Sequence, residues 1–276
     1  MKFKAKNKIF LAPMEEVNDI AFRLLCKKAG AGLTYTPMTH PLTQQKIFLD
    51  DKPVLQIFCT TTKNIKEFMK KHDKKVSGWD FNLGCPAKTA KRHGFGVFLH
   101  SNLETIEKIL KLMRENTKKP LSIKIRKSDY TSKIIKIANK YCDVICIHPR
   151  TQSQGYSGEP DLEFAKSLRK YTKLPLIYSG NVYKKNYKKF LKDFDYVMIG
   201  RRAIGNPNIF AELTGKKIKH KIDFKDYLKL AEKYKLPFRQ LKFQAMNFTK
   251  GKQNSKKIRL AIFKIKQVEE LKNLEL

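Results

Sequence analysis

The chain has 276 residues, 41% of them apolar, which suits one barrel-sized domain with a small appendage. It carries 59 Lys and Arg against 25 Asp and Glu, and its formal net charge of +34 favours contact with a polyanion such as nucleic acid. Because 49 of the basic residues are Lys, a general lysine bias would produce a similar excess. No apolar run approaches the roughly 18 residues of a membrane span, and the start lacks the apolar core of a signal peptide. We therefore expect a cytoplasmic protein without a membrane partner.

The cysteines indicate a reduced compartment. There are five, an odd number, and none forms a Cys-x-x-Cys pair. The sequence therefore predicts neither a disulfide framework nor a metal site.

Strand-like and helix-like segments alternate along most of the chain. The strand-like segments are 8–11, 33–36, 54–58, 79–83, 121–125, 143–147, 176–178 and 196–199. The amphipathic helical segments are 19–28, 65–71, 103–115, 132–140, 161–171, 184–191 and 206–213. This alternation predicts a parallel sheet with crossover helices. Eight strands, with no Gly-x-Gly-x-x-Gly after the first, favour a closed (β/α)₈ TIM barrel over an open α/β sheet.

The pattern changes after Gly215. No further strand is predicted, and three helical segments follow, at 223–235, 237–250 and 255–274. Residues 216–276 carry 18 basic and 6 acidic residues, a net charge of +12. We expect a catalytic barrel over 1–215 and a small C-terminal helical domain over 216–276 that offers a docking surface for a polyanion.

Two glycine-containing turns at the ends of the last two strands predict a phosphate site. Gly180 precedes Asn181, and Gly200 precedes Arg201. Glycine lets backbone amides approach an anion closely, and barrels often bind phosphate on these two loops. Each pair alone is also compatible with a plain turn.

Three further residues at strand ends are candidates for chemistry. Lys124 is either a surface lysine, a partner for an anion or electron-rich ring, or a Schiff-base lysine. His148 is either structural or a ligand-binding residue. Cys85 lies between Gly84 and Pro86, in a tight turn rather than a buried strand, which favours a chemical role.

These motifs resemble those of the flavin-dependent tRNA-dihydrouridine synthases, over residues 8–213. The similar segments are Ala12-Pro13-Met14, Asn82-Leu83-Gly84-Cys85-Pro86-Ala87-Lys88, Lys124-Ile125-Arg126, His148-Pro149-Arg150-Thr151, Ser179-Gly180-Asn181-Val182 and Gly200-Arg201. Two features depart from the family pattern. Cys59 replaces a glycine after the Gln56 strand, and three C-terminal helices are recognisable where four are expected.

The resemblance implies an FMN cofactor across the mouth of the barrel, with NADPH or NADH as reductant and tRNA as partner. The implied cofactor-binding residues are Pro13 and Met14 along the ring, Gln56 and Lys124 at its polar edge, His148, and Asn181, Gly200 and Arg201 around the phosphate.

The resemblance also implies the residues that meet the RNA. Asn82 and Tyr156 would face the uracil, Arg150 would lie where the RNA enters, and Cys85 would be the catalytic acid. Reduction of the uracil 5,6 double bond needs a hydride at C6 and a proton at C5, so the Cys85 thiol must be protonated when the base arrives. The base must also leave its stack to reach a barrel mouth.

Three other functions fit part of the pattern. A small-molecule flavin oxidoreductase of the dihydroorotate dehydrogenase type shares the barrel, the phosphate loops and the lysine, but the +34 charge and the His148-Pro149-Arg150-Thr151 segment argue against it. A Schiff-base aldolase would use Lys124 and leave Cys85 and Gln56 unexplained. A non-catalytic RNA-binding barrel would explain the charge alone.

Overall fold

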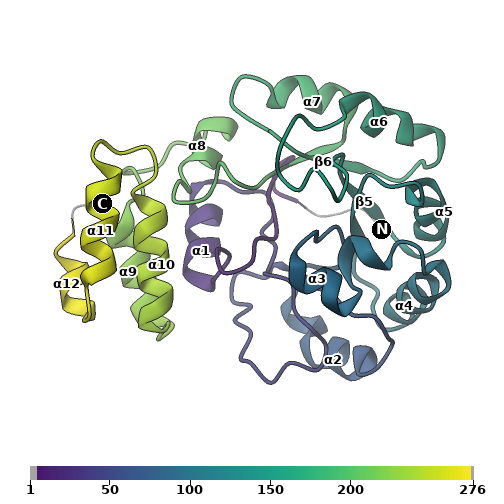
Figure 1. Ribbon diagram of the computed structural model, residues 1–276, viewed down its shortest axis with the longest axis horizontal. Helices are drawn as coiled ribbons and strands as arrows, with labels where there is room; N and C mark the ends of the chain where they lie inside the picture. Colours follow the sequence, from purple (N-terminus) through teal and green to yellow (C-terminus); the bar gives the residue numbers. More distant parts are fainter. Residues whose placement is uncertain (1–4, 275–276) are drawn as a thin grey trace.

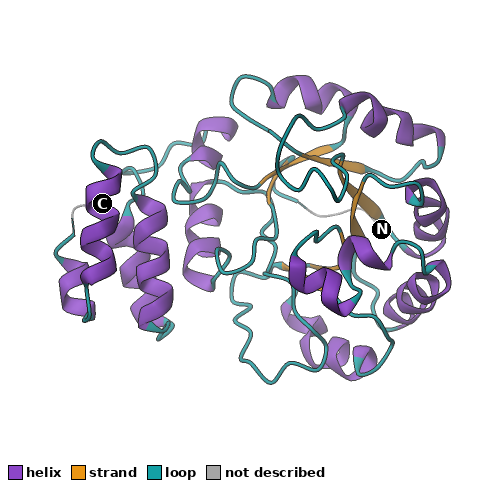
Figure 2. Cartoon of the chain, in the orientation of Figure 1, coloured by secondary structure: helices purple, strands orange, loops and turns teal. Residues whose placement is uncertain are grey.

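The computed structural model describes residues 5–274, in which a parallel sheet is surrounded by helices (Figures 1 and 2). The strands are β1 (Ile9–Leu11), β2 (Val54–Ile57), β3 (Gly78–Leu83), β4 (Leu121–Arg126), β5 (Val144–His148), β6 (Leu176–Ser179) and β7 (Tyr196–Ile199). Their order is β1-β7-β6-β5-β4-β3-β2, so the first strand lies beside the last. The sheet therefore curls into a barrel whose ladder is interrupted only between β1 and β2.

Residues 33–36 lie between β1 and β2 without forming a regular strand. Leu33 accepts a backbone hydrogen bond from β1 (2.9 Å), and Thr36 donates one to β2 (3.0 Å). The regular ladder is then interrupted, because the Gln56 amide donates to Oγ1 of Thr36 (3.1 Å) instead of a backbone carbonyl, and pairing with β2 resumes at Thr39, whose amide donates to the Gln56 carbonyl (2.9 Å). The predicted TIM-barrel fold is confirmed, whereas the regular strand predicted over 33–36 is wrong.

Helices cover the outer face of the barrel (Figure 2). They are α1 (Ile20–Ala29), α2 (Ile65–His72), α4 (Leu103–Glu115), α5 (Thr131–Tyr141), α6 (Leu162–Ser167), α7 (Tyr187–Asp193) and α8 (Ile209–Thr214), with short 3₁₀ turns at 73–75 and 168–170. The short helix α3 (Lys88–His93), followed by a 3₁₀ turn at 96–99, is drawn in front of the barrel in Figure 1 instead. In α4 the buried residues recur every three or four positions, which is the spacing of one helix face. No helix within residues 5–274 is long and apolar enough to span a bilayer.

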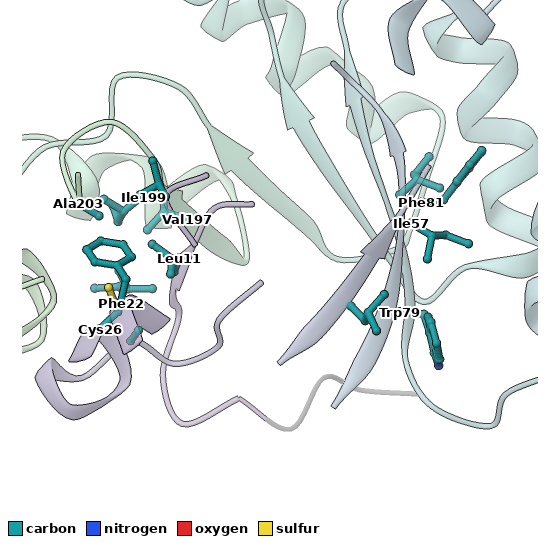
Figure 3. Packing of buried hydrophobic residues seen from close by; sticks show 14 of the residues in the cluster. Leu11, Phe22, Cys26, Ile57, Trp79, Phe81, Val197, Ile199 and Ala203 are labelled. Atoms are coloured by element: carbon teal, nitrogen blue, oxygen red, sulfur yellow. The ribbon is translucent and has the colours of Figure 1, made fainter. Parts of the chain in front are cut away.

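The strands divide the apolar core into two parts. Phe10, Cys146 and Ile177 belong to the smaller cluster, and Leu11 and Val197 to the larger one shared with the helices. Figure 3 shows part of this larger cluster, with Phe22 of α1 close to Leu11 and Val197. Alternate residues of one buried strand thus serve two apolar layers.

Four helices follow the barrel and lie beside α1 and α8 (Figure 1): α9 (Phe224–Lys233), α10 (Phe238–Phe248), α11 (Ser255–Lys264) and α12 (Val268–Lys272). The single helix predicted over 255–274 is wrong, because it breaks at Ile265, whose backbone is extended. Nζ of Lys242 donates to the carbonyls of Phe263 and Ile265 (2.8 Å each), and a capping box at Gln267 starts the next helix. The four helices match the number that the family resemblance expects.

Asp19 connects the barrel to these helices. Its Oδ1 accepts from the Phe22 amide (2.9 Å) and so caps α1. Its Oδ2 accepts from Tyr227 (3.1 Å), Gln240 (2.7 Å) and Gln244 (2.8 Å). Burial raises the pKa of this carboxyl group, and the four hydrogen bonds oppose that effect. One carboxylate thus joins a barrel helix to α9 and α10.

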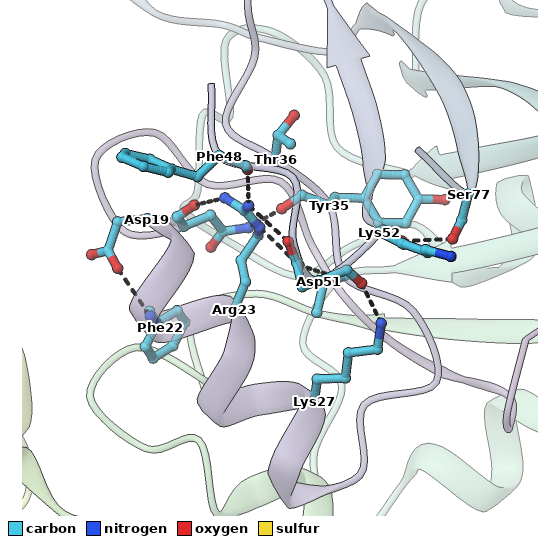
Figure 4. A network of polar contacts seen from close by, with 12 residues as sticks. Asp19, Phe22, Arg23, Lys27, Tyr35, Thr36, Phe48, Asp51, Lys52 and Ser77 are labelled. Carbon is cyan, nitrogen blue, oxygen red and sulfur yellow. Dashed lines mark hydrogen bonds and ion pairs between the residues drawn. The ribbon is translucent and has the colours of Figure 1, made fainter. Parts of the chain in front are cut away.

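A buried ion pair holds the irregular closing segment in place (Figure 4). Arg23 of α1 makes two hydrogen bonds to Asp51, of 2.9 and 3.0 Å, and Thr34 donates to the same carboxylate (2.6 Å). The side chains of Arg23 and Asp51 are 3% and 0% exposed. The pair therefore ties α1 to residues 33–36 and to the loop that leads into β2.

We predict that Asp51→Ala lowers the free energy of unfolding by about 3–5 kcal/mol, because it leaves the buried guanidinium of Arg23 without a counter-charge. Urea unfolding followed by circular dichroism measures the change. Glu104→Ala is the control, because it breaks the exposed Glu104–Lys108 pair and should leave the midpoint nearly unchanged. Equal midpoints for the two variants would contradict the role of Asp51.

Candidate active site

A cavity of about 640 Å³ opens at the carboxyl ends of the strands. Barrel enzymes carry their chemistry at this end. All twelve residues predicted from the sequence line it: Pro13, Met14, Gln56, Asn82, Cys85, Lys124, His148, Arg150, Tyr156, Asn181, Gly200 and Arg201. The structure therefore brings these residues together, and the contact of each with a cofactor or substrate stays a prediction.

Three amide and carboxyl side chains form a chain of hydrogen bonds across the cavity floor. Nδ2 of Asn82 donates to Oε1 of Gln56 (2.8 Å), and Nε2 of Gln56 donates to Asp80 (2.6 Å). Asp80 is fully buried and also accepts from Ser122 (2.5 Å). Burial raises the pKa of Asp80 to about 7, while the hydrogen bonds and Lys124 lower it. This network fixes the orientation of both amides.

Cys85 lies in a turn that Asn82 organises. Oδ1 of Asn82 accepts from the amides of Gly84 (3.1 Å) and Cys85 (3.0 Å). A side chain at Gly96 would come within 2.6 Å of the Cys85 carbonyl, so only glycine permits this approach. Cys85 is partly exposed, and burial raises the pKa of its thiol. The thiol is therefore protonated at neutral pH and can donate a proton.

The other four cysteines are buried in the core. Burial raises the pKa of Cys59 and of Cys146 to about 12. Cys85 is thus the cysteine that reaches the cavity among the described residues.

Lys124 projects from β4 beside Asn82 on β3 and Cys146 on β5. No hydrogen-bond or ion-pair partner for its ammonium is found within residues 5–274. An ammonium group in a half-enclosed cavity is stabilised by an anionic or electron-rich ligand. Lys124 is therefore positioned to meet such a ligand.

His148 is neutral in this structure. It is 7% exposed, and its Nε2 lies 3.0 Å from Nη1 of Arg150. A guanidinium only donates, so Nε2 accepts and Nδ1 carries the proton. Burial, followed by Lys124, Arg126 and nearby arginines, lowers the pKa of His148 to about 2.

Arg150 is buried, whereas a residue that contacts incoming RNA at the entrance of the site should be exposed. It is 1% exposed, and its guanidinium donates to the carbonyls of Ser157 (3.0 Å) and Gly158 (2.6 Å) as well as to Asn181 (3.1 Å). These contacts hold the loop after β5 against the loop after β6. We therefore expect Arg150 to position the site rather than to bind RNA at its entrance.

The two predicted phosphate loops lie side by side. Gly180 has a φ of 145°, and an added Cβ would come within 3.0 Å of Pro160. Asn181 has a left-handed φ of 46°, and its Oδ1 accepts from both Arg150 and Arg201 (3.0 Å). The turns thus combine close backbone approach with two guanidinium groups, the features that bind phosphate.

Tyr156 is the exposed aromatic residue of the cavity rim, at 58% exposure. The guanidinium groups of Arg126 and Arg201 lie 5.3 and 5.5 Å from the centroid of its ring. Such a ring offers a flat surface for stacking with a base.

Sequence reasoning missed several residues that line the cavity or adjoin it. Arg126 is buried and donates to the Gly84 carbonyl (2.8 Å), which steadies the turn before Cys85. Arg202 follows Arg201 in the same loop, and Lys250 comes from the helical domain. Arg126 belongs to the Lys124-Ile125-Arg126 segment and Arg202 follows Arg201, so both could have been included. No local signal marks Lys250.

A TIM barrel with a polar cavity at the carboxyl ends of its strands belongs to the class of barrel enzymes. Residues 10–275 match the model of the dihydrouridine synthase (Dus) family, and the chain belongs to that family. The predicted resemblance is therefore confirmed.

Relatives with assigned names support the same family. The chain is 33% identical to a probable tRNA-dihydrouridine synthase of Helicobacter pylori, over 77% of this chain and 72% of that one. It is 29% identical to tRNA-dihydrouridine synthase B of Pasteurella multocida, over 75% of this chain and 69% of that one. A probable tRNA-dihydrouridine synthase of Aquifex aeolicus is 28% identical, over 100% of this chain and 99% of that one.

Solved structures confirm the fold. The old yellow enzyme homologue of Zymomonas mobilis superposes with a TM-score of 0.54 at 12% identity, over 82% of this chain and 94% of that one. Morphinone reductase in complex with tetrahydroNAD gives a TM-score of 0.51 at 12% identity, over 81% of this chain and 90% of that one. At these identities the similarity concerns the barrel alone.

We predict that His148 makes the free energy of unfolding pH-dependent in the ligand-free protein. Its pKa of about 2 in the folded protein lies below the value of about 6.5 in the unfolded chain. Its contribution to the free energy of unfolding is therefore fully present above pH 6.5 and is lost as the pH falls. When the pH falls from 7.5 to 5.5, the free energy of unfolding of the wild type should decrease by about 1.4 kcal/mol more than that of His148→Gln. Urea unfolding at both pH values measures this difference, and parallel losses in the two proteins would contradict it.

Proposed function

We propose that this chain reduces the 5,6 double bond of uridines in tRNA, with FMN as cofactor and NADPH or NADH as reductant. Membership of the dihydrouridine synthase family carries the proposal. It also disfavours the aldolase, the small-molecule oxidoreductase and the non-catalytic RNA binder. The protonated Cys85 thiol in the shared cavity supports the same reaction.

The cavity fits FMN in size and in the chemistry of its ends. About 640 Å³ lies within the usual range of roughly 300–1,000 Å³ for cofactor pockets. At one end Asn181, Gly200 and Arg201 would hold the phosphate, with glycine turns and a guanidinium group. At the other end Lys124 offers an unpaired ammonium. The distribution of charge therefore suits a phosphorylated ring cofactor.

The residues between these ends would hold the ring. Pro13 and Met14 would line its face, and Gln56 would bind its polar edge with the N–H that Asp80 does not take. Neutral His148 would offer its Nδ1 proton, because Arg150 occupies Nε2. Lys124 would stabilise negative charge at the N1 and O2 edge.

Bound FMN, once reduced by the nicotinamide, would supply the hydride for C6 of the uracil. Cys85 would donate the proton to C5, and its sulfur would then regain a proton from water. Tyr156 would stack against the base, and Asn82 would orient it while holding the turn of Cys85. The chain's own part is thus to place the base and to keep the acid protonated.

The tRNA would lie along a groove between the barrel and the helical domain. This groove, of about 1420 Å³, adjoins the main cavity and is lined by the exposed lysines Lys184, Lys185, Lys221 and Lys225. Its acidic lining residues are Glu159, Glu212 and Asp223. The excess of cations is suited to a phosphate backbone.

We predict that Cys85→Ala keeps flavin reduction by NADPH but forms dihydrouridine about 10²- to 10⁴-fold more slowly, because the positioned proton donor is lost. Stopped-flow flavin absorbance and mass spectrometry of tRNA nucleosides measure the two half-reactions. Cys59→Ala is the matched control, since Cys59 is buried outside the cavity. Near-normal product from Cys85→Ala would remove Cys85 from the mechanism.

We predict that replacing Lys184, Lys185 and Lys221 together by Ala weakens tRNA binding at least about tenfold and flattens its salt dependence, because fewer counterions are released. Filter binding across a salt series measures both effects. The control replaces Lys70, Lys71 and Lys74, exposed lysines near the end of α2, and removes the same charge. Equal effects of the two triple variants would show that net charge, rather than the groove, determines binding.

A further inference from the structure

Lys250 belongs to the helical domain but reaches the barrel's cavity. It follows α10 by two residues and lines both the main cavity and the groove. Its Nζ donates to the carbonyl oxygen of Arg201 (2.8 Å). The ammonium therefore lies next to the loop proposed to bind phosphate.

The charges around Lys250 are not balanced by carboxylates. Within residues 5–274, neither Lys250 nor Arg201 nor Arg202 takes part in an ion pair. Glu159, which also lines the groove, accepts instead from Nδ2 of Asn181 (2.9 Å). Burial, together with Arg202 and Arg201, lowers the pKa of Lys250. The charges of Arg202 and Arg201 therefore act on the Lys250 ammonium, and an anion between these residues would relieve the repulsion.

A tight backbone contact fixes the position of Lys250. A Cβ added to Gly205 would lie 1.9 Å from the carbonyl oxygen of Asn247, so α10 meets the loop after β7 at the closest distance that glycine allows. Gly205 also has a left-handed φ of 68°. Asn247, in the last turn of α10 and three residues before Lys250, is thus held against the loop after β7.

We propose that Lys250 binds the phosphate of FMN together with Arg201, so that the helical domain completes the cofactor site of the barrel. This inference rests on the proposed function. A phosphate monoester carries nearly two negative charges, which suits a cluster of cations beside two glycine turns. The contact of Lys250 with the Arg201 loop favours this anion over an RNA phosphate farther along the groove. By linkage, FMN would also stabilise the docked helical domain.

Lys250→Ala tests the proposal, with Lys252→Ala as matched control. Lys252 lines the groove but not the main cavity, so its loss removes the same charge from the same segment. Flavin-free protein is titrated with FMN and with riboflavin, which lacks the phosphate, and quenching of flavin fluorescence reports binding. We expect Lys250→Ala to weaken FMN binding about 10- to 100-fold and riboflavin binding less than about twofold. Lys250→Arg should restore most of the FMN affinity.

A second measurement uses inorganic phosphate, which should raise the Tm of the flavin-free wild type and Lys252→Ala more than that of Lys250→Ala. Equal loss of FMN and riboflavin affinity in Lys250→Ala would overturn the proposal, because Lys250 would then support the cavity in general. Full FMN affinity with weaker tRNA binding would overturn it by assigning Lys250 to the RNA.

The same titration separates this inference from the proposed function. A wild type that binds FMN no better than riboflavin contradicts the phosphate site itself. If the wild type binds FMN more tightly than riboflavin and Lys250→Ala keeps the same ratio of affinities, only the assignment of Lys250 is contradicted.

Discussion

All seven strands of the sheet run in the same direction, and the site depends on this constraint. Parallel strands place their carboxyl ends at one end of the barrel, so residues from every strand end meet there although they are far apart in the sequence. Gln56 and Lys124, for example, reach one cavity from β2 and β4. An apolar cluster that includes Phe10 and Ile177 packs the strands below them. The polar side chains are thus confined to the end where loop lengths can vary.

Burial and nearby charges give the titratable side chains of this cavity different protonation states. The surrounding cations and burial keep His148 neutral, while burial keeps the Cys85 thiol protonated. A protonated thiol therefore shares the cavity with the cationic side chains of Lys124 and Arg201. The hydrogen bonds from Asn82 through Gln56 to Asp80 belong to the same arrangement, because they hold the two amide side chains in one orientation.

The sequence predicted the barrel, seven of its strands and twelve of the residues that line the cavity, because strand periodicity and the turn motifs are local signals. Residues 33–36 have the composition of a strand, and the ladder is interrupted where the Thr36 side chain accepts the Gln56 amide in place of a backbone carbonyl. The break at Ile265 depends on Lys242 from another helix. The burial of Arg150 and the approach of Lys250 likewise arise from contacts between distant segments, which no local pattern records.

Residue 215 separates two patterns in the sequence, but the contacts that stabilise the fold connect the segments on both sides of it. Phe224, Tyr227 and Phe248 belong to the same buried cluster as α1, and Asp19 binds three side chains from α9 and α10. Removing residues 222–276 would therefore expose apolar surface of the barrel and leave Oδ2 of Asp19 without its three donors. Loss of activity in such a truncation would not isolate RNA docking, because barrel stability would change as well. Single side chains along the groove and at the phosphate loop separate these effects, since they leave the shared core intact.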